Sequence, residues 1–134
     1  MTNDFGTDFA DELTDYIVDG TDIPAAAATY YVTLYDDTGT ELNGSFQNGR
    51  VAVGTADWTE TDTNAFENAS EINFGENTSG ATVTVQEFAI KDSDADDATA
   101  RELFRADITN APQDFADGTR VFFPAGDLDV DILD

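Results

Sequence analysis

The excess of carboxylates over cations is the feature that most limits what this chain can be. Its 134 residues include 29 Asp and Glu against 5 Lys and Arg, a formal net charge of −24. This charge excludes attraction to nucleic acid or to anionic lipid as a main role. The chain also has no His and no Cys, which excludes a Ser-His-Asp triad, a thiolate nucleophile, an imidazole-bound metal and a disulfide framework.

High net charge with low hydropathy is also typical of disordered chains. Here, however, 40% of the residues are hydrophobic, and 10 Phe, 4 Tyr and 1 Trp are spread along the whole length. Most of them follow helical or alternating patterns. The sequence therefore predicts a single folded domain over residues 1–134 with an acidic surface.

The acidic surface suits concentrated salt. A folded protein of this mass exposes roughly 6,800 Å², so its carboxylates lie about 15 Å apart on average. In about 1 M salt the screening length falls to about 3 Å and their mutual repulsion vanishes. Lys91 is the single lysine, and the acids are dispersed among Thr, Ala and Asn rather than gathered in one block. These features favour a protein of a halophile or of a virus that infects one.

Targeting signals are not expected in this sequence. The charged residues among the first twenty are all acidic, unlike those of a secretory or transit peptide. No apolar run approaches the roughly 18 residues needed to cross a bilayer. Three Asn-x-Ser triplets begin at Asn43, Asn68 and Asn77, and we interpret these asparagines as polar turn residues.

An amphipathic helix is predicted near the N-terminus. Phe5, Phe9, Leu13 and Ile17 recur every four residues and share a face with Tyr16. Thr7 is the expected N-cap, Asp8, Asp11 and Glu12 favour the positive end of the helix dipole, and Gly20 can close the helix.

The period then changes from helical to alternating, which indicates short β-strands. They are expected at 29–35, 50–53, 72–74, 81–90, 103–108, 120–123 and 127–133, with residues 55–69 as a polar segment anchored by Trp58 and Phe66. The apolar residues switch from odd positions, ending at Val85, to even positions, starting at Phe88. One extra residue would keep both sets on the same face, so we predict a β-bulge at Gln86-Glu87. We therefore expect a mainly β fold: an antiparallel, jelly-roll-like β-sandwich of about seven to eight strands with one N-terminal amphipathic helix.

Two acidic clusters are candidate cation sites. Asp92, Asp94, Asp96 and Asp97 imitate the start of a calcium loop, but positions six and twelve hold Asp97 and Leu103 instead of Gly and Glu. A solvated acidic hairpin tip is the favoured interpretation. Asp127, Asp129 and Asp131 form a row with a spacing of about 6.7 Å, which favours an exposed face that protects a sheet edge. We expect no metal or cofactor site beyond weak, non-specific cation binding.

Catalysis and sugar binding are weaker alternatives. A glycosidase needs two carboxylates beside a substrate cleft, with pKa values separated by burial, and no catalytic residue can be assigned here. One set of aromatic residues could line a sugar-binding face: Tyr30, Tyr31, Tyr35 and Trp58. Aromatic residues at strand spacing more commonly form part of the core, which is the favoured interpretation.

The order of short motifs carries a family resemblance. After the helix come Pro24-Ala25, Tyr31-Val32-Thr33-Leu34-Tyr35, Arg50 to Val53, Trp58, Ile72 to Phe74, Val85 to Asp92, Leu103 to Ile108 and Phe123 to Ile132. This order resembles a family of small virion proteins of tailed viruses, described as tail fibre proteins and, in some viruses, as capsid fibres or turrets. The present chain has acids where the family usually has Ser, Thr and Gly, which fits a haloarchaeal host.

The resemblance implies a non-enzymatic structural protein at the virion surface, assembled in the host cytoplasm. Its helix or one end would dock on the capsid or tail, and its loops, at 36–48, 64–80 and 92–99, would face the medium. The implied partners are further copies of the chain, the major capsid protein or tail proteins, and a host surface glycoprotein or glycan, with no nucleic acid and no membrane insertion. We expect a capsid turret or decoration protein of a haloarchaeal tailed virus; the alternatives are a tail fibre protein and a halophilic carbohydrate-binding or adhesion module.

The charge predicts salt-dependent stability. We expect the melting temperature to be higher in about 2 M KCl than in about 50 mM KCl, because screening removes the carboxylate repulsion. Far-UV circular dichroism at both salt concentrations measures this. An equal melting temperature in the two buffers would refute the halophilic interpretation.

Overall fold

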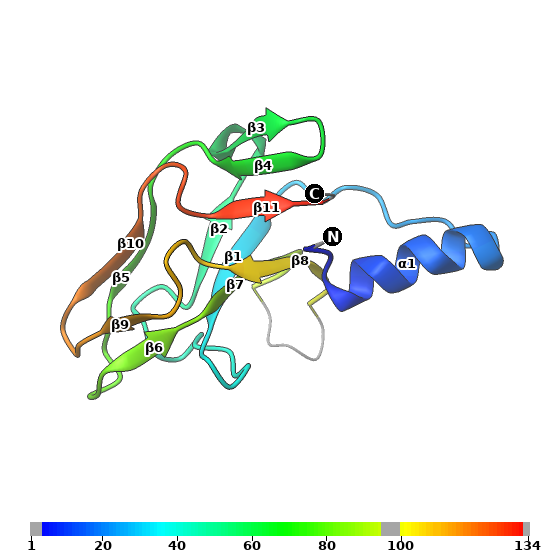
Figure 1. The fold of residues 1–134 in the computed structure, drawn as a ribbon. Coiled ribbons are helices and arrows are strands. Elements are labelled where there is room, and N and C mark those ends of the chain that lie inside the picture. The colour runs from blue at the N-terminus through cyan, green and yellow to red at the C-terminus, as the bar shows by residue number, and fades with distance from the viewer. Residues whose placement is uncertain (1–3, 95–99, 133–134) are drawn as a thin grey trace.

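The computed structural model describes residues 4–94 and 100–132 (Figure 1). These residues form one α-helix, a short 3-10 helix, η1 (Thr55–Asp57), and eleven strands that pair antiparallel. No helix in the described ranges is both long enough and apolar enough to span a bilayer. The mainly β class with one N-terminal helix is therefore confirmed.

A four-stranded sheet is the largest element of the fold. Its order is β2-β1-β7-β8, formed by β2 (Arg50–Val53), β1 (Tyr30–Tyr35), β7 (Glu87–Lys91) and β8 (Glu102–Asp107). The predicted alternation holds on β1, where Val32 and Leu34 have no exposed surface and point into the apolar core. Because β1 lies inside the sheet, its backbone groups pair with β2 on one side and β7 on the other.

Three smaller sheets share the same core. Their strands are β5 (Ile72–Glu76) with β10 (Arg120–Phe123), β6 (Val83–Val85) with β9 (Gln113–Phe115), and β11 (Asp129–Asp131) with β4 (Ala65–Asn68) and β3 (Trp58–Asp62). Phe74, Phe123 and Val130 from these sheets join one hydrophobic cluster with Leu34 and Phe88 of the large sheet. The core thus lies between the large sheet and the smaller ones.

The number of strands exceeds the expected seven or eight, chiefly because residues 55–69 form a hairpin. The polar strand β3 is mostly exposed, so it has no alternating apolar pattern to reveal it. Backbone pairing with β4 holds it in place, and the ring of Trp58 packs edge-on against Phe66 at 5.4 Å between centroids. The two aromatic anchors were predicted correctly, but the strands between them were not.

The switch of the apolar residues from odd to even positions within 81–90 is not caused by the predicted β-bulge. The chain leaves β6 at Val85 and begins β7 at Glu87, so Gln86 stands between two strands of different sheets. Its N–H donates to Tyr35 O and its carbonyl accepts from the Ile108 N–H. Val85 and Phe88 both point into the core because the chain changes its pairing partner there.

Two of the three Asn-x-Ser asparagines are buried structural residues. The Asn68 side chain donates to the carbonyls of Phe123 and Pro124 and accepts from the Leu128 N–H at 2.9 Å. Asn77 likewise donates to Ala81 O and Phe115 O. Both side chains substitute for backbone partners at turns, whereas Asn43 is exposed.

The second face of β1 covers a buried ionic cluster. The Glu41 carboxylate accepts from Thr33 Oγ1 at 2.6 Å and from Arg50 Nε and Nη2, each at 2.8 Å. Lys91 Nζ lies 3.4 Å from the same carboxylate. The side chains of Glu41, Arg50 and Lys91 are only 3–4% exposed. Buried charges are tolerated when they are paired and hydrogen-bonded, so this cluster fixes the 36–49 loop onto the sheet.

Loss of the central carboxylate should destabilise the fold. We expect Glu41→Gln to lower the free energy of unfolding by about 3 to 5 kcal/mol, because Arg50 and Lys91 would remain buried with less compensating charge. Urea unfolding measures this. The control is Asp37→Asn, an exposed acid of the same loop; equal stability of the two variants would show that the cluster contributes little.

Candidate docking site

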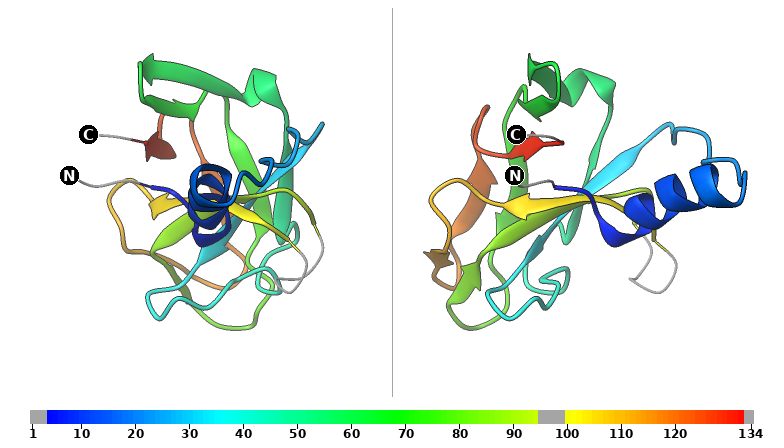
Figure 2. Two further views of the ribbon diagram at one scale, coloured as in Figure 1. Left: turned by 90° about the vertical axis from the view of Figure 1, so that its right-hand side faces the viewer. Right: turned by 45° about the vertical axis from the view of Figure 1, so that its right-hand side comes forward.

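Residues 7–29 form an arm that projects from the sheets. The arm consists of the helix α1 (Thr7–Val18) and the segment 19–29, which returns to the start of β1. Figures 1 and 2 show the helix extending away from the strands, with its first turn at the body. At 12 residues the helix is about 18 Å long. Such short helices are marginal in water by themselves, so the contacts at the base of the arm decide whether it forms.

The chain just before the helix is held by backbone pairing. The Gly6 N–H donates to Leu103 O at 2.8 Å, and the Arg105 N–H donates to Asp4 O at 2.8 Å. A Cβ atom at Gly6 would lie 2.4 Å from Glu102 O, so only glycine permits this approach to β8. Gly6, rather than the predicted Thr7, is the N-cap residue, and it provides no side-chain cap.

Aromatic packing and one ion pair fix the first half of the helix. The rings of Phe5, Phe9 and Phe104 form a triangle with centroids 5.8 Å apart. Arg101 donates from Nε and Nη2 to the Glu12 carboxylate, both at 2.6 Å. The paired carboxylate raises the pKa of Arg101, a side chain that is always protonated in proteins.

The second half of the helix has little contact with the body. Tyr16, Ile17 and Val18, which we term the arm tip, are 51%, 79% and 72% exposed. The predicted apolar stripe is therefore split: Phe5 and Phe9 pack on β8, but Ile17 and Tyr16 do not face the core. Gly20 closes the helix as predicted, with φ of +68°, and turns the chain back toward β1.

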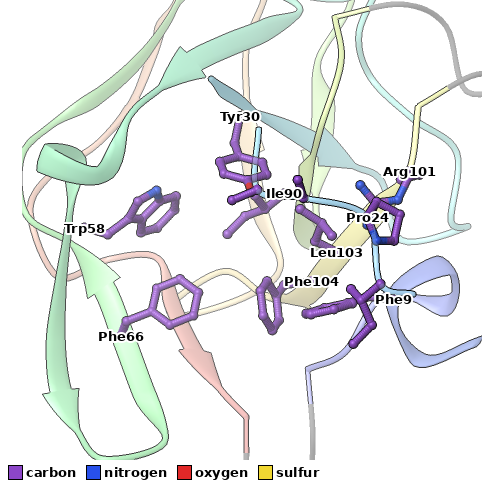
Figure 3. A pocket seen from close by; sticks show the side chains of 12 residues that line it. Phe9, Pro24, Tyr30, Trp58, Phe66, Ile90, Arg101, Leu103 and Phe104 are labelled. Atoms are coloured by element: carbon purple, nitrogen blue, oxygen red, sulfur yellow. The ribbon is translucent and has the colours of Figure 1, made fainter. Parts of the chain in front are cut away.

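An apolar groove of about 310 Å³ lies beside the base of the arm. Figure 3 shows Trp58 and Phe66 of the β3–β4 hairpin on one side and Phe9 and Pro24 of the arm on the other. Phe66 and Phe104 pack edge-on with centroids 5.4 Å apart, so a continuous row of rings runs from Trp58 to the helix. Ile23, Ala25, Ala26, Tyr30, Ile90, Arg101 and Leu103 complete the lining.

The aromatic residues proposed for a sugar-binding face separate in the structure. Tyr30 and Trp58 both line the groove, and Tyr30 Oη accepts from the Ala27 N–H at 2.9 Å. Tyr35 instead is buried, with the Arg105 guanidinium 3.6 Å from its ring centroid. Tyr31 points to the same sheet face as Tyr35, opposite Lys91. The four residues therefore form no common face.

The acidic cluster at 92–97 is described only in part, and its first member is ion-paired rather than solvated. Asp92 accepts from Arg101 Nη1 and from the Arg101 N–H, whereas Asp96 and Asp97 lie outside the described residues. Burial and the neighbouring Glu67 raise the pKa of Asp129 on the edge strand β11. Among the described residues, no three acids are arranged to hold a metal ion.

The part of the chain that contains the groove and the base of the arm matches a known protein family. Residues 5–131 match the model of the family described as podophage GP4 fiber I protein gp80. The chain belongs to this family. A search of the curated proteins found no match. The match begins at Phe5, one residue before the helix cap, and so includes the whole arm, the groove and every strand of the fold.

Membership in a phage fibre family agrees with the resemblance that the motif order indicates, at the level of a fibre-like virion protein. Exposed apolar surface such as that of the groove and the arm tip often marks contacts with other molecules. The sequence alone did not reveal the groove, since its lining comes from five strands and the arm.

The ion pair at the base should control the order of the arm. We expect Glu12→Gln to weaken helix α1 by about 1 kcal/mol, which lowers amide-exchange protection of residues 10–18 about fivefold while β1 and β7 keep theirs. Hydrogen exchange followed by mass spectrometry measures this. Asp11→Asn, an exposed neighbour on the same helix, is the control, and equal protection in both variants would contradict the anchoring role.

Proposed function

We propose that this chain is a fibre-like structural protein on the outer surface of a tailed virus of a haloarchaeal host, in the form of a capsid turret or decoration. The observation that carries the proposal is the family match over residues 5–131. A fibre component works by being held in place and by presenting surface, which fits a fold with an anchored, projecting arm.

The net negative charge of the chain supports the proposed host, which lives in concentrated salt. All five basic residues make ion pairs with carboxylates of the chain itself. Five cations cannot balance 29 acids, so most of the acidic surface has only solvent ions to neutralise it. That surface favours folding and assembly at high ionic strength.

The fold has two different ends, which supports one fixed orientation of the molecule in the virion. The arm lies at one end of the molecule, and the turns that join β9 to β10 and β5 to β6 lie at the opposite end (Figure 1). We place the arm end toward the virion or toward neighbouring copies, and the opposite end toward the medium. Host attachment through a glycoprotein or glycan would then use that outer end.

Two of the three expected outward loops need correction, and most of the third, 92–99, lies outside the described residues. Residues 64–80 are not a free loop, because they contain β4 and β5 and the buried Asn68 and Asn77. Residues 36–48 are tied to the sheet through Glu41. The turn at Asp117-Gly118, between β9 and β10, is exposed and is a better candidate for the outer end.

A tail fibre is the alternative within the same class, and the description of the family as a fibre protein favours it. The two positions differ in copy number, since capsid decorations repeat over many vertices or faces whereas tail fibres surround a single axis. A halophilic carbohydrate-binding module remains the alternative from another class, with Tyr30 and Trp58 in the groove as its sugar contacts.

Analysis of purified virions tests the proposal. We expect mass spectrometry to detect this chain in salt-gradient-purified particles, and antibody-labelled electron microscopy to place it on the outside of the head. Label at the tail would favour the tail fibre. Absence of the chain from the particles would overturn the proposal, and binding of the isolated chain to a glycan array would then support the carbohydrate-binding module.

A further inference from the structure

The arm tip and the groove are complementary surfaces on one chain. The tip presents Tyr16, Ile17 and Val18, each more than half exposed. The groove presents an apolar, partly open cavity lined by Trp58 and Phe66. Exposed apolar patches of this kind mark contacts with other molecules, and a chain that exposes both partners of such a contact can bind a second copy of itself.

We propose that the arm tip of one copy seats in the groove of the next copy, so that the chains assemble head to tail. This inference rests on the proposed function, in that a virion surface component is present as repeated copies. It goes beyond that function by naming the two surfaces that join the copies.

The size of the groove suits the tip. A cavity of about 150 Å³ lined by apolar side chains accommodates a benzene molecule, and the groove measures about 310 Å³. It therefore has room for Ile17 together with the Tyr16 ring or Val18. Its aromatic walls offer edge and face contacts to both kinds of side chain.

The lining of the groove is less acidic than the chain as a whole. The arm carries acids and no cation, and Asp15 and Asp19 flank the tip. In a chain with 29 acids, no carboxylate belongs to the described groove lining, and its charged member is Arg101. Arg101 is already paired with Glu12 and Asp92, so the acidic helix approaches through apolar contact with the lining and in salt that screens the carboxylates.

The area of the contact favours copies that are each held by two insertions over a pair joined by one. The three tip side chains leave on the order of 400 Å² to bury, about half of the roughly 800 Å² per partner in a stable protein interface. In a head-to-tail arrangement each copy inserts its tip into one neighbour and receives the tip of another. Each copy is then held twice, as in a ring or helical array.

Engineered cysteines test the contact directly, because the natural chain has none. Glu60 lies opposite Phe66 in the β3–β4 pair and on the Trp58 side of β3 by strand alternation. Thr59, the adjacent residue, points to the other side. Ile17→Cys copies are mixed with differently tagged Glu60→Cys copies, or with Thr59→Cys copies as the matched control, in molar KCl under mild oxidation.

We expect disulfide-linked pairs of Ile17→Cys with Glu60→Cys at least tenfold more abundant than pairs with Thr59→Cys. The double variant Ile17→Cys/Glu60→Cys should give a ladder beyond dimers. Products that stop at the dimer, or Ile17→Cys copies linked mainly to each other, would overturn the head-to-tail contact. Absence of any cross-link above the control would overturn it as well.

A measurement without cysteines gives a second, independent answer. Trp58 is the single tryptophan, so its fluorescence emission should shift to shorter wavelength as the chain associates in molar salt. Ile17→Ser should abolish both the shift and the increase in mass in sedimentation, with unchanged circular dichroism because Ile17 is exposed. If Ile17→Ser associates like the natural chain, the proposal fails, whereas detection of the chain in virions would leave the proposed function intact.

Discussion

Burial of β1 on both faces is the constraint on which the rest of the structure depends. One face places Val32 and Leu34 in the apolar core, and the other places Thr33 against the Glu41 carboxylate. The first contact gains from removing apolar surface from water. The second costs desolvation and is tolerated because Glu41 is matched by Arg50 and Lys91. The strand can therefore hold the 36–49 loop and the smaller sheets in fixed positions on opposite sides.

The arm depends on this sheet through β8. Its short helix is held by the Phe5, Phe9 and Phe104 rings and by the pair of Glu12 with Arg101, all at its first two turns. The last turn of the helix is mostly exposed. In a phage fibre family, such a division between an anchored base and an exposed tip suits a part that meets another chain.

Prediction from sequence succeeded where the pattern was local and strong. The alternation in residues 30–35, the strands at Arg50–Val53 and Arg120–Phe123, and the N-terminal helix are all present. It failed for β3, because an exposed edge strand needs no apolar alternation, and at Gln86, because a change of pairing partner produces the same parity shift as a β-bulge. The groove could not be predicted from the sequence. Its aromatic residues come together only when distant segments pack, namely Trp58, Phe66, Phe104 and Phe9.

The sequence by itself determined the acidic surface, the mainly β class and the family resemblance, because charge, alternation and motif order are properties of the linear chain. Only the tertiary structure decided which half of the amphipathic helix is covered. Periodicity identifies an apolar face, but it does not show how much of that face packs on the body. Here Phe9 packs on Phe104 of β8, and Glu12 pairs with Arg101 just before that strand. Ile17, beyond these contacts, stays exposed.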